Sequence, residues 1–138
     1  MPYLKMPKTA YVSGPMTGHI DFNKQGFEDC AEFLIRLGIS CLVPGSGEAY
    51  TESEVLALSV EEVKRHWYMR KDFGMVLAVE SIVLLPGWMD SQGARAEVLV
   101  AQELGLSLWE YFPQQADWME RLQPLKDVLV ETSVRVLA

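Results

Sequence analysis

Residues 81–105 constrain the fold more than any other stretch, because they predict a strand, a turn and a helix in direct succession. The apolar, β-branched run Ser81–Leu85 is typical of a buried strand, and Pro86–Gly87 ends it. A helix is predicted over Gln92–Leu104, where Gly105 stops it. A strand that turns directly into a helix is the building unit of α/β domains.

The start of this helix predicts a site for an anion. Asp90 and Ser91 are residue types that cap helices, and the first-turn N–H groups lack partners within the helix. Together with the helix dipole, these groups attract negative charge. Ser91 and the N–H groups of Gln92 and Gly93 are therefore placed to hold a phosphate or a sugar hydroxyl. The alternative is that Asp90 and Ser91 only cap the helix.

One carboxylate falls on the inward face of the same helix. Ala94, Ala101 and Leu104 recur at helical spacing along one apolar line, and Glu97 lies on that line. A carboxylate among apolar residues is out of place unless it is paired or used. Glu97 is therefore either a functional group or half of a buried ion pair.

The whole chain alternates short apolar runs with segments of helical periodicity. This pattern predicts an α/β fold, a Rossmann-like sandwich with a mostly parallel four- to five-stranded sheet and helices on both faces, as a single domain over residues 1–138. The predicted strands are Thr9–Ser13, Ile39–Val43, Ser81–Leu85 and Ser107–Tyr111, and the other predicted helices are Asp21–Leu37, Val55–Val79 and Ala116–Val130. The last residues, 132–138, are left open as a tail, a fifth strand or a dimer contact.

Three loops then meet at the carboxyl edge of the sheet, where open α/β sheets bind ligands. They are Gly14–Gly18, Pro44–Ser53 and Pro86–Gly93. The first loop has neither a P-loop lysine nor dinucleotide-binding spacing, so it is either a ligand loop or a plain turn. Asp72 lies near the inward stripe of its helix and reaches the same cleft as Glu97, unless it is a solvated helix residue. Two carboxylates in a shared apolar pocket can do nucleophilic or acid–base work on a glycosyl carbon.

Charge, apolar runs and cysteines limit the classes of partner and the cellular location that we expect. The 138 residues carry a net charge of -7 and contain no basic run, so a nucleic-acid polymer is not expected as a partner. No apolar stretch is long enough for a membrane span or a signal peptide, and we expect a cytoplasmic protein. Cys30 and Cys41 fall in apolar elements without metal spacing, so we expect buried free thiols, a reducing compartment, no metal and no cofactor.

At these residues the sequence resembles the nucleoside 2-deoxyribosyltransferase superfamily, which includes the 2′-deoxynucleoside 5′-phosphate N-hydrolases. It looks closest to a branch carried by phages and prophages. The resemblance spans roughly residues 9–112. The matching pieces are Tyr11–Gly18 (YVSGPMTG), Phe22, Asn23 and Phe27, Val43–Pro44, Arg70–Asp72 (RKD) and Leu84–Glu97 (LLPGWMDSQGARAE).

The resemblance implies roles for particular residues. Glu97 would be the nucleophile that attacks C1′ of the nucleoside, Asp72 an acid beside the sugar that protonates the leaving base, and Tyr11 a residue that positions the nucleophile. Ser91 and Gly93 would contact the 5′-phosphate, and Gly14, Pro15 and Met16 would form the floor under the base. Ser13, Asp90 and Gln92 complete the expected substrate-binding residues.

These features predict a hydrolase that cleaves the N-glycosidic bond of a (deoxy)nucleoside 5′-monophosphate. The segment Asp90-Ser91-Gln92-Gly93 lacks the transferase pattern, in which an acidic residue directly precedes a Gly-Thr pair. This departure favours hydrolysis over base exchange. Arg95 also departs from the small or aromatic residues expected there, and it points elsewhere on the helix. The alternatives are base exchange between nucleosides and a non-catalytic nucleotide-binding or sensing protein. The resemblance further implies a homodimer or larger homo-oligomer, with the segment around Trp109 and Trp118 as either the contact or part of the core.

Overall fold

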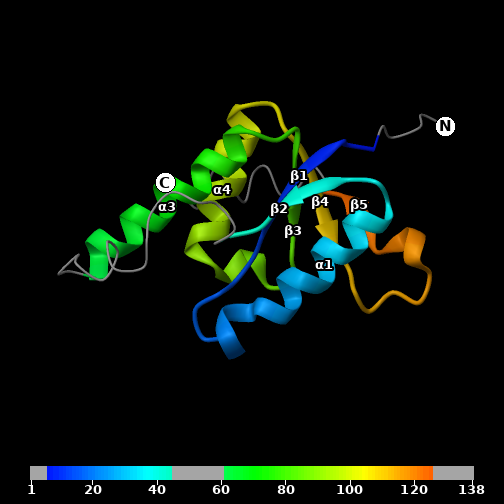
Figure 1. Ribbon diagram of the computed structural model, residues 1–138, viewed down its shortest axis with the longest axis horizontal. Coiled ribbons are helices and arrows are strands. Elements are labelled where there is room, and N and C mark those ends of the chain that lie inside the picture. The colour runs from blue at the N-terminus through cyan, green and yellow to red at the C-terminus, as the bar shows by residue number, and fades with distance from the viewer. Residues whose placement is uncertain (1–5, 45–60, 126–138) are drawn as a thin grey trace.

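The computed structural model describes residues 6–44 and 61–125, with side chains in the second range from residue 68 onward. It is an α/β domain built on one five-stranded sheet in the order β2-β1-β3-β4-β5 (Figure 1). The strands are β1 (Thr9–Ser13), β2 (Ser40–Leu42), β3 (Ser81–Leu84), β4 (Ser107–Tyr111) and β5 (Leu122–Pro124). The first four are parallel and β5 is antiparallel to β4. The predicted fold class is therefore confirmed.

Helices lie on both faces of this sheet. Helix α1 (Lys24–Arg36) covers one face, and α3 (Glu61–Leu77) and α4 (Gln92–Glu103) cover the other (Figure 1). The alternation of side chains along the strands separates the two cores. In β1, Val12 faces α1, whereas Tyr11 faces α3 and α4.

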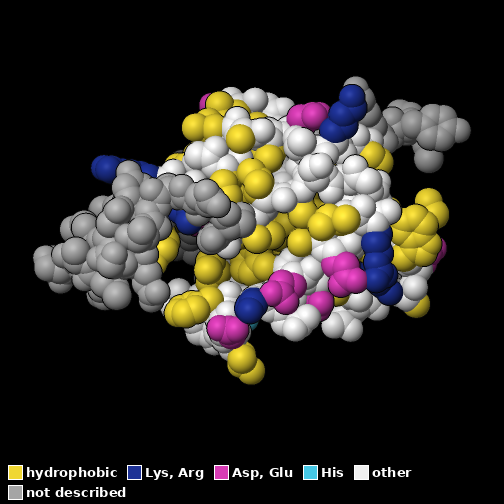
Figure 2. Space-filling model, in the orientation of Figure 1, with side chains coloured by type: hydrophobic (Ala, Val, Ile, Leu, Met, Phe, Trp, Pro, Cys, Tyr) yellow, Lys and Arg dark blue, Asp and Glu magenta, His cyan; other side chains and the backbone are white. Residues whose placement is uncertain are grey.

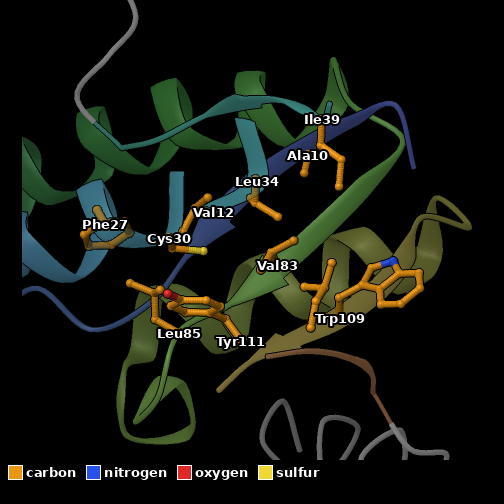
Figure 3. Close-up of a cluster of buried hydrophobic side chains, with 11 residues drawn as sticks. Ala10, Val12, Phe27, Cys30, Leu34, Ile39, Val83, Leu85, Trp109 and Tyr111 are labelled. Carbon is orange, nitrogen blue, oxygen red and sulfur yellow. The ribbon is translucent and has the colours of Figure 1, made fainter. Parts of the chain in front are cut away.

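The α1 side is a continuous apolar core (Figure 3). Phe27, Cys30 and Leu34 recur along one side of α1 and are all buried against the sheet. The outer side of α1 carries charges of both signs (Figure 2), paired as Lys24–Glu28 and Arg36–Glu32. Such exposed pairs contribute little, so the apolar face fixes the helix in place.

The parallel arrangement sets the position of the site. Because β1, β3 and β4 are parallel, their carboxyl ends open at one edge of the sheet, as predicted. The predicted loop Pro44–Ser53, the start of the predicted helix Val55–Val79 and residues 132–138 lie wholly or mostly outside the described residues.

The prediction of a helix over Ala116–Val130 is wrong for the part of the chain that the structure describes. Residues Trp118–Glu120 form only a 3₁₀ turn, and Leu122–Pro124 is strand β5. The edge strand accepts Pro124 because an edge position needs fewer backbone donors. The hydrogen bond from Phe112 N to Arg121 O, at 2.7 Å, and that from Leu125 N to Leu108 O, at 2.9 Å, tie this segment to β4.

Smaller predictions about burial also need correction. Leu104 is 49% exposed, because it is the C-cap residue of α4 and lies beyond its last turn. Both cysteines are free thiols, but only Cys30 is buried, and Cys41 is half-buried. Trp109 belongs to the core, whereas Trp118 is 53% exposed and packs its ring on Phe33. In residues 6–44 and 61–125 no helix has the length and apolarity needed to cross a membrane.

Candidate active site

The centre of the site is the carboxylate of Glu97 on α4, which is only 4% exposed. Two hydroxyls from β1 hold it. Tyr11 Oη donates to Glu97 Oε2 at 2.7 Å, and Ser13 Oγ donates to Glu97 Oε1 at 2.6 Å. Tyr11 and Ser13 lie two residues apart on β1, so their side chains point to the same face of the sheet. Each oxygen of the carboxylate therefore has its own donor.

The ion-pair alternative for Glu97 does not describe this arrangement, because both ion pairs found among the described residues join exposed side chains of α1. Burial raises the pKa of Glu97 from its ordinary 4.5 to about 7, although the hydrogen bonds from Ser13 and Tyr11 lower it and the charge of Asp72 raises it further. A carboxyl group with a pKa near neutrality inside a protein is typical of functional sites.

Asp72 reaches this cluster from α3. Its side chain is half-buried, and burial raises its pKa from 3.8 to about 6, with Lys71 acting in the opposite direction. The negative charge of Asp72 also raises the pKa values of Glu97 and Tyr11, so the three groups share one electrostatic environment. The pKa order means that Asp72 loses its proton before Glu97 does. Between about pH 6 and 7 the pair of carboxyl groups therefore carries one proton.

The loop after β1 passes directly beside this cluster. Gly14 has no space for a side chain, since a Cβ there would lie 2.6 Å from the Cβ of Leu85. The peptide N–H of Leu85 donates to Ser13 O at 2.8 Å, which holds the two chains at this separation. Pro15 is buried and Met16 is half-buried.

The matching residues Phe22 and Asn23 explain how this loop is anchored. Asn23 Nδ2 donates to Pro15 O at 3.0 Å. Asp21, Phe22 and Asn23 all have positive φ angles, of 50°, 53° and 63°, which is a costly conformation for residues with side chains. Strain of this kind is found where surrounding structure enforces it, often beside a functional site.

The N-terminus of α4 lies after the loop from β3. Ser91 is its N-cap, and Ser91 Oγ accepts from the N–H of Ala94 at 3.2 Å. The N–H groups of Gln92 and Gly93 have no hydrogen-bond partner among the residues that the structure describes. Gly93 is half-buried, Gln92 is exposed, and Asp90 is exposed in a 3₁₀ turn before the cap.

Arg95 supports the loop that precedes this helix. Its Nη1 donates to Met89 O at 2.9 Å, so the guanidinium folds back along α4 toward the helix N-terminus. Trp88 is buried, and its Nε1 lies 3.5 Å from Glu110 Oε2. An open hollow of about 280 Å³ lies beside this loop, at the carboxyl ends of β3 and β4, and Glu97 is not among its lining residues.

The fold thus brings Glu97, Asp72, Tyr11 and Ser13 together, with the loop Gly14–Met16 beside them. Asp90 and Gln92 lie on the surface at the N-terminus of α4. Ser13 was expected to contact substrate, yet its hydroxyl is fully buried and directed at Glu97. The sequence does carry a signal for this contact: Ser13 lies two residues after Tyr11 on a strand, so both side chains face the helix that carries Glu97. Among the described residues no group of three His, Cys, Asp or Glu side chains is arranged to hold a metal ion.

Residues 8–110 match the sequence profile of the family described as "Domain of unknown function (DUF4406)". The chain belongs to this family. No curated protein sequence matches this DUF4406 chain.

Two solved structures share its fold. One is a 2-deoxyribosyltransferase from the psychrotolerant bacterium Bacillus psychrosaccharolyticus, with a TM-score of 0.56 and 16% identity over 91% of this chain and 81% of that one. The other is a 2-deoxyribosyltransferase from Leishmania mexicana, with a TM-score of 0.53 and 20% identity over 76% of this chain and 64% of that one. The resemblance noted from the sequence is confirmed at the level of the fold.

Proposed function

We propose that this DUF4406 protein is an enzyme that hydrolyses the N-glycosidic bond of a (deoxy)nucleoside 5′-monophosphate. The products would be the free base and the sugar 5-phosphate. The observation that carries the proposal is the buried carboxylate of Glu97, held through both oxygens beside the second carboxyl group of Asp72. The fold shared with two 2-deoxyribosyltransferases supports a reaction at a nucleoside C1′.

In the first step Glu97 acts as the nucleophile. One of its oxygens forms a bond to C1′ as the bond from C1′ to the base nitrogen breaks. The electron pair of the broken bond goes to the base, which takes a proton from Asp72. In the second step a water molecule attacks C1′, its proton passes to Asp72, and Glu97 leaves as a carboxylate.

This mechanism needs Glu97 ionised and Asp72 protonated. With a pKa of about 7 for Glu97 and about 6 for Asp72, the single proton of the pair lies mainly on Glu97 between these values. The reactive form is therefore the less populated of the two one-proton forms, and its population is greatest in that range. Proton transfer by a positioned acid contributes about 10²–10⁴-fold to such rates. The reaction should therefore be fastest where one proton remains on the pair.

The N-terminus of α4 is the candidate site for the 5′-phosphate. The free N–H groups of Gln92 and Gly93 and the hydroxyl of Ser91 converge there, and an anion is favoured at a helix N-terminus. The loop Gly14–Met16 lies beside Glu97 and would form the floor under the base. Ser91 keeps its hydroxyl proton available, because its oxygen acts as an acceptor toward Ala94 N.

Base exchange between nucleosides is the second candidate, and the named activity of both solved neighbours favours it. The same residues would act, but a second base would replace water in the second step. A protein that binds nucleotides without catalysis would need no buried carboxyl group with a hydrogen-bond donor on each oxygen. The clamped Glu97 therefore favours the two enzyme hypotheses over the binding one.

The test is a panel of nucleoside 5′-monophosphates and free nucleosides incubated with purified protein, with free base measured by chromatography. A second set contains an added free base. Release of base from a monophosphate without an acceptor, absent in Glu97→Gln, supports hydrolysis. Turnover only with the added base supports exchange. Binding of a nucleotide without turnover in either set contradicts both.

The phosphate site is tested at Ser91 with two variants. Ser91→Asp keeps a helix-capping oxygen but adds a negative charge, and Ser91→Ala removes the cap, which costs about 1 kcal/mol of stability. Both should lose activity on the monophosphate, and Ser91→Asp should lose more because of charge repulsion. An equal loss on the matched nucleoside and on the monophosphate would contradict a phosphate role.

A further inference from the structure

We propose that Ser13 is a positioning residue that fixes the carboxylate of Glu97 in one orientation and favours its ionised form, and is not a contact for the substrate. This inference rests on the proposed role of Glu97 as the nucleophile. It assigns to the strand residue before Gly14 a function in the reaction that differs from base or sugar recognition.

The geometry sets the position and the rotation of the carboxylate. The single donor Tyr11 would hold only Oε2, and the carboxylate would still be free to tilt about that one hydrogen bond. The second donor, Ser13 on Oε1 at 2.6 Å, removes that freedom. A nucleophile held in one orientation reacts with less loss of entropy in the transition state.

Ser13 is itself held firmly. It pairs with Leu84 in the parallel register of β1 and β3, and its carbonyl accepts from Leu85 N at 2.8 Å. Its side chain is fully buried, and a serine hydroxyl has only one proton to donate. Because that proton is already directed at Glu97 Oε1, none remains for a substrate atom.

The charges around Glu97 explain why a second donor is needed. The titratable groups that face it are Tyr11 from β1 and Asp72 from α3, with Lys71 acting on Asp72. Asp72 repels a negative charge on Glu97, and on α4 the guanidinium of Arg95 is directed toward Met89 O. Within the described residues, the two hydroxyls are therefore the direct hydrogen-bonding support for the ionised carboxylate.

The same hydrogen bond changes during the reaction. When an oxygen of Glu97 bonds to C1′, the carboxylate loses its charge and its hydrogen bonds weaken. When water displaces the sugar, the electron pair of the C1′–O bond returns to Glu97, and the hydroxyls of Tyr11 and Ser13 stabilise the charge again. Ser13 therefore assists the return of Glu97 to its starting state.

The test measures the titration of the Glu97 carboxyl carbon by NMR in ¹³C-labelled protein, with the signal assigned by its absence in Glu97→Gln. Removing a hydrogen bond to a charged group should raise the pKa in Ser13→Ala by about 1–2 pH units. Ser13→Thr keeps the hydroxyl and should restore the wild-type value. Ser13→Cys, with a weak donor, should fall between them and serves if Ser13→Ala does not fold.

Activity gives the second readout. The acid limb of the kcat/KM profile of Ser13→Ala should move up in pH together with the NMR pKa. A raised KM with an unchanged pKa of Glu97 would mean that Ser13 contacts the substrate, and it would overturn the inference. The titration needs no substrate, so it can distinguish a failure of the proposed function from a failure of the proposed role of Ser13. A protein without turnover contradicts the proposed function, whereas an active wild type whose Ser13→Ala variant keeps the same pKa contradicts only the role of Ser13.

Discussion

Replacing the candidate nucleophile should stabilise the fold at neutral pH while removing activity. Glu97→Gln keeps the shape of the side chain but has no charge to bury. Tyr11 and Ser13 can still pair with the amide, because each hydroxyl can both donate and accept. The carboxylate is thus a group that serves the reaction at a cost to folding.

The magnitude follows from the pKa of Glu97 in the folded chain. Its rise from 4.5 to about 7 corresponds to about 3 kcal/mol, because one pKa unit is worth about 1.36 kcal/mol. Below pH 4.5 the group is neutral in both folded and unfolded chains, so there is no penalty. As pH rises from 4.5 to 7 the unfolded chain releases the proton first, and the stability of the wild type falls. Above pH 7 the full penalty is present in the wild type and absent in Glu97→Gln.

The assay is urea unfolding of both proteins at a series of pH values from 4 to 8. The difference in the free energy of unfolding, variant minus wild type, should grow by about 3 kcal/mol across this range, a shift of roughly 1–3 M in the urea midpoint. Glu103→Gln, on the exposed surface of the same helix, is the matched control. A difference for Glu97→Gln that stays constant from pH 4 to 8 would refute the reasoning.

Two further predictions follow from the same site. Gly14→Ala should lower the free energy of unfolding by about 1–3 kcal/mol, since its Cβ meets a core leucine at 2.6 Å. Gly74→Ala in α3, where a Cβ would have no atom within 4 Å, should instead raise the free energy of unfolding by up to about 1 kcal/mol. Calorimetry of both variants measures the two changes. A Gly14→Ala variant more stable than Gly74→Ala would contradict this packing. The profile of kcat/KM against pH should be a bell with its maximum between about 6 and 7, with an acid limb from Glu97 and an alkaline limb from Asp72. Asp72→Asn should remove the alkaline limb, and an unchanged profile would exclude Asp72 as the acid.

The sequence was sufficient for the parallel sheet and for the burial of Glu97. Strands β1 and β4 have the predicted bounds, because short β-branched and aromatic runs between glycines and polar turns leave few other structures. Glu97 was predicted on the inward line of α4 from helical periodicity alone, and Ala94 and Ala101 on that line are buried with it.

The parts that were not predicted depend on contacts between distant segments. The apolar spacing of residues 116–130 also fits a helix, and the choice of a strand comes from pairing with the free edge of β4. Ser13 is adjacent to a glycine loop, which favoured a substrate role. Its actual partner lies 84 residues away, and periodicity cannot show which helix covers a given strand face.

Covalent trapping tests the central claim most directly. Wild-type protein that releases base from a monophosphate is quenched in acid during turnover, and its intact mass and peptide map are recorded. The proposed mechanism predicts an added sugar phosphate on the peptide that contains Glu97, absent from Glu97→Gln. Base release that continues unchanged in Glu97→Gln, or an adduct on another residue, would contradict Glu97 as the nucleophile.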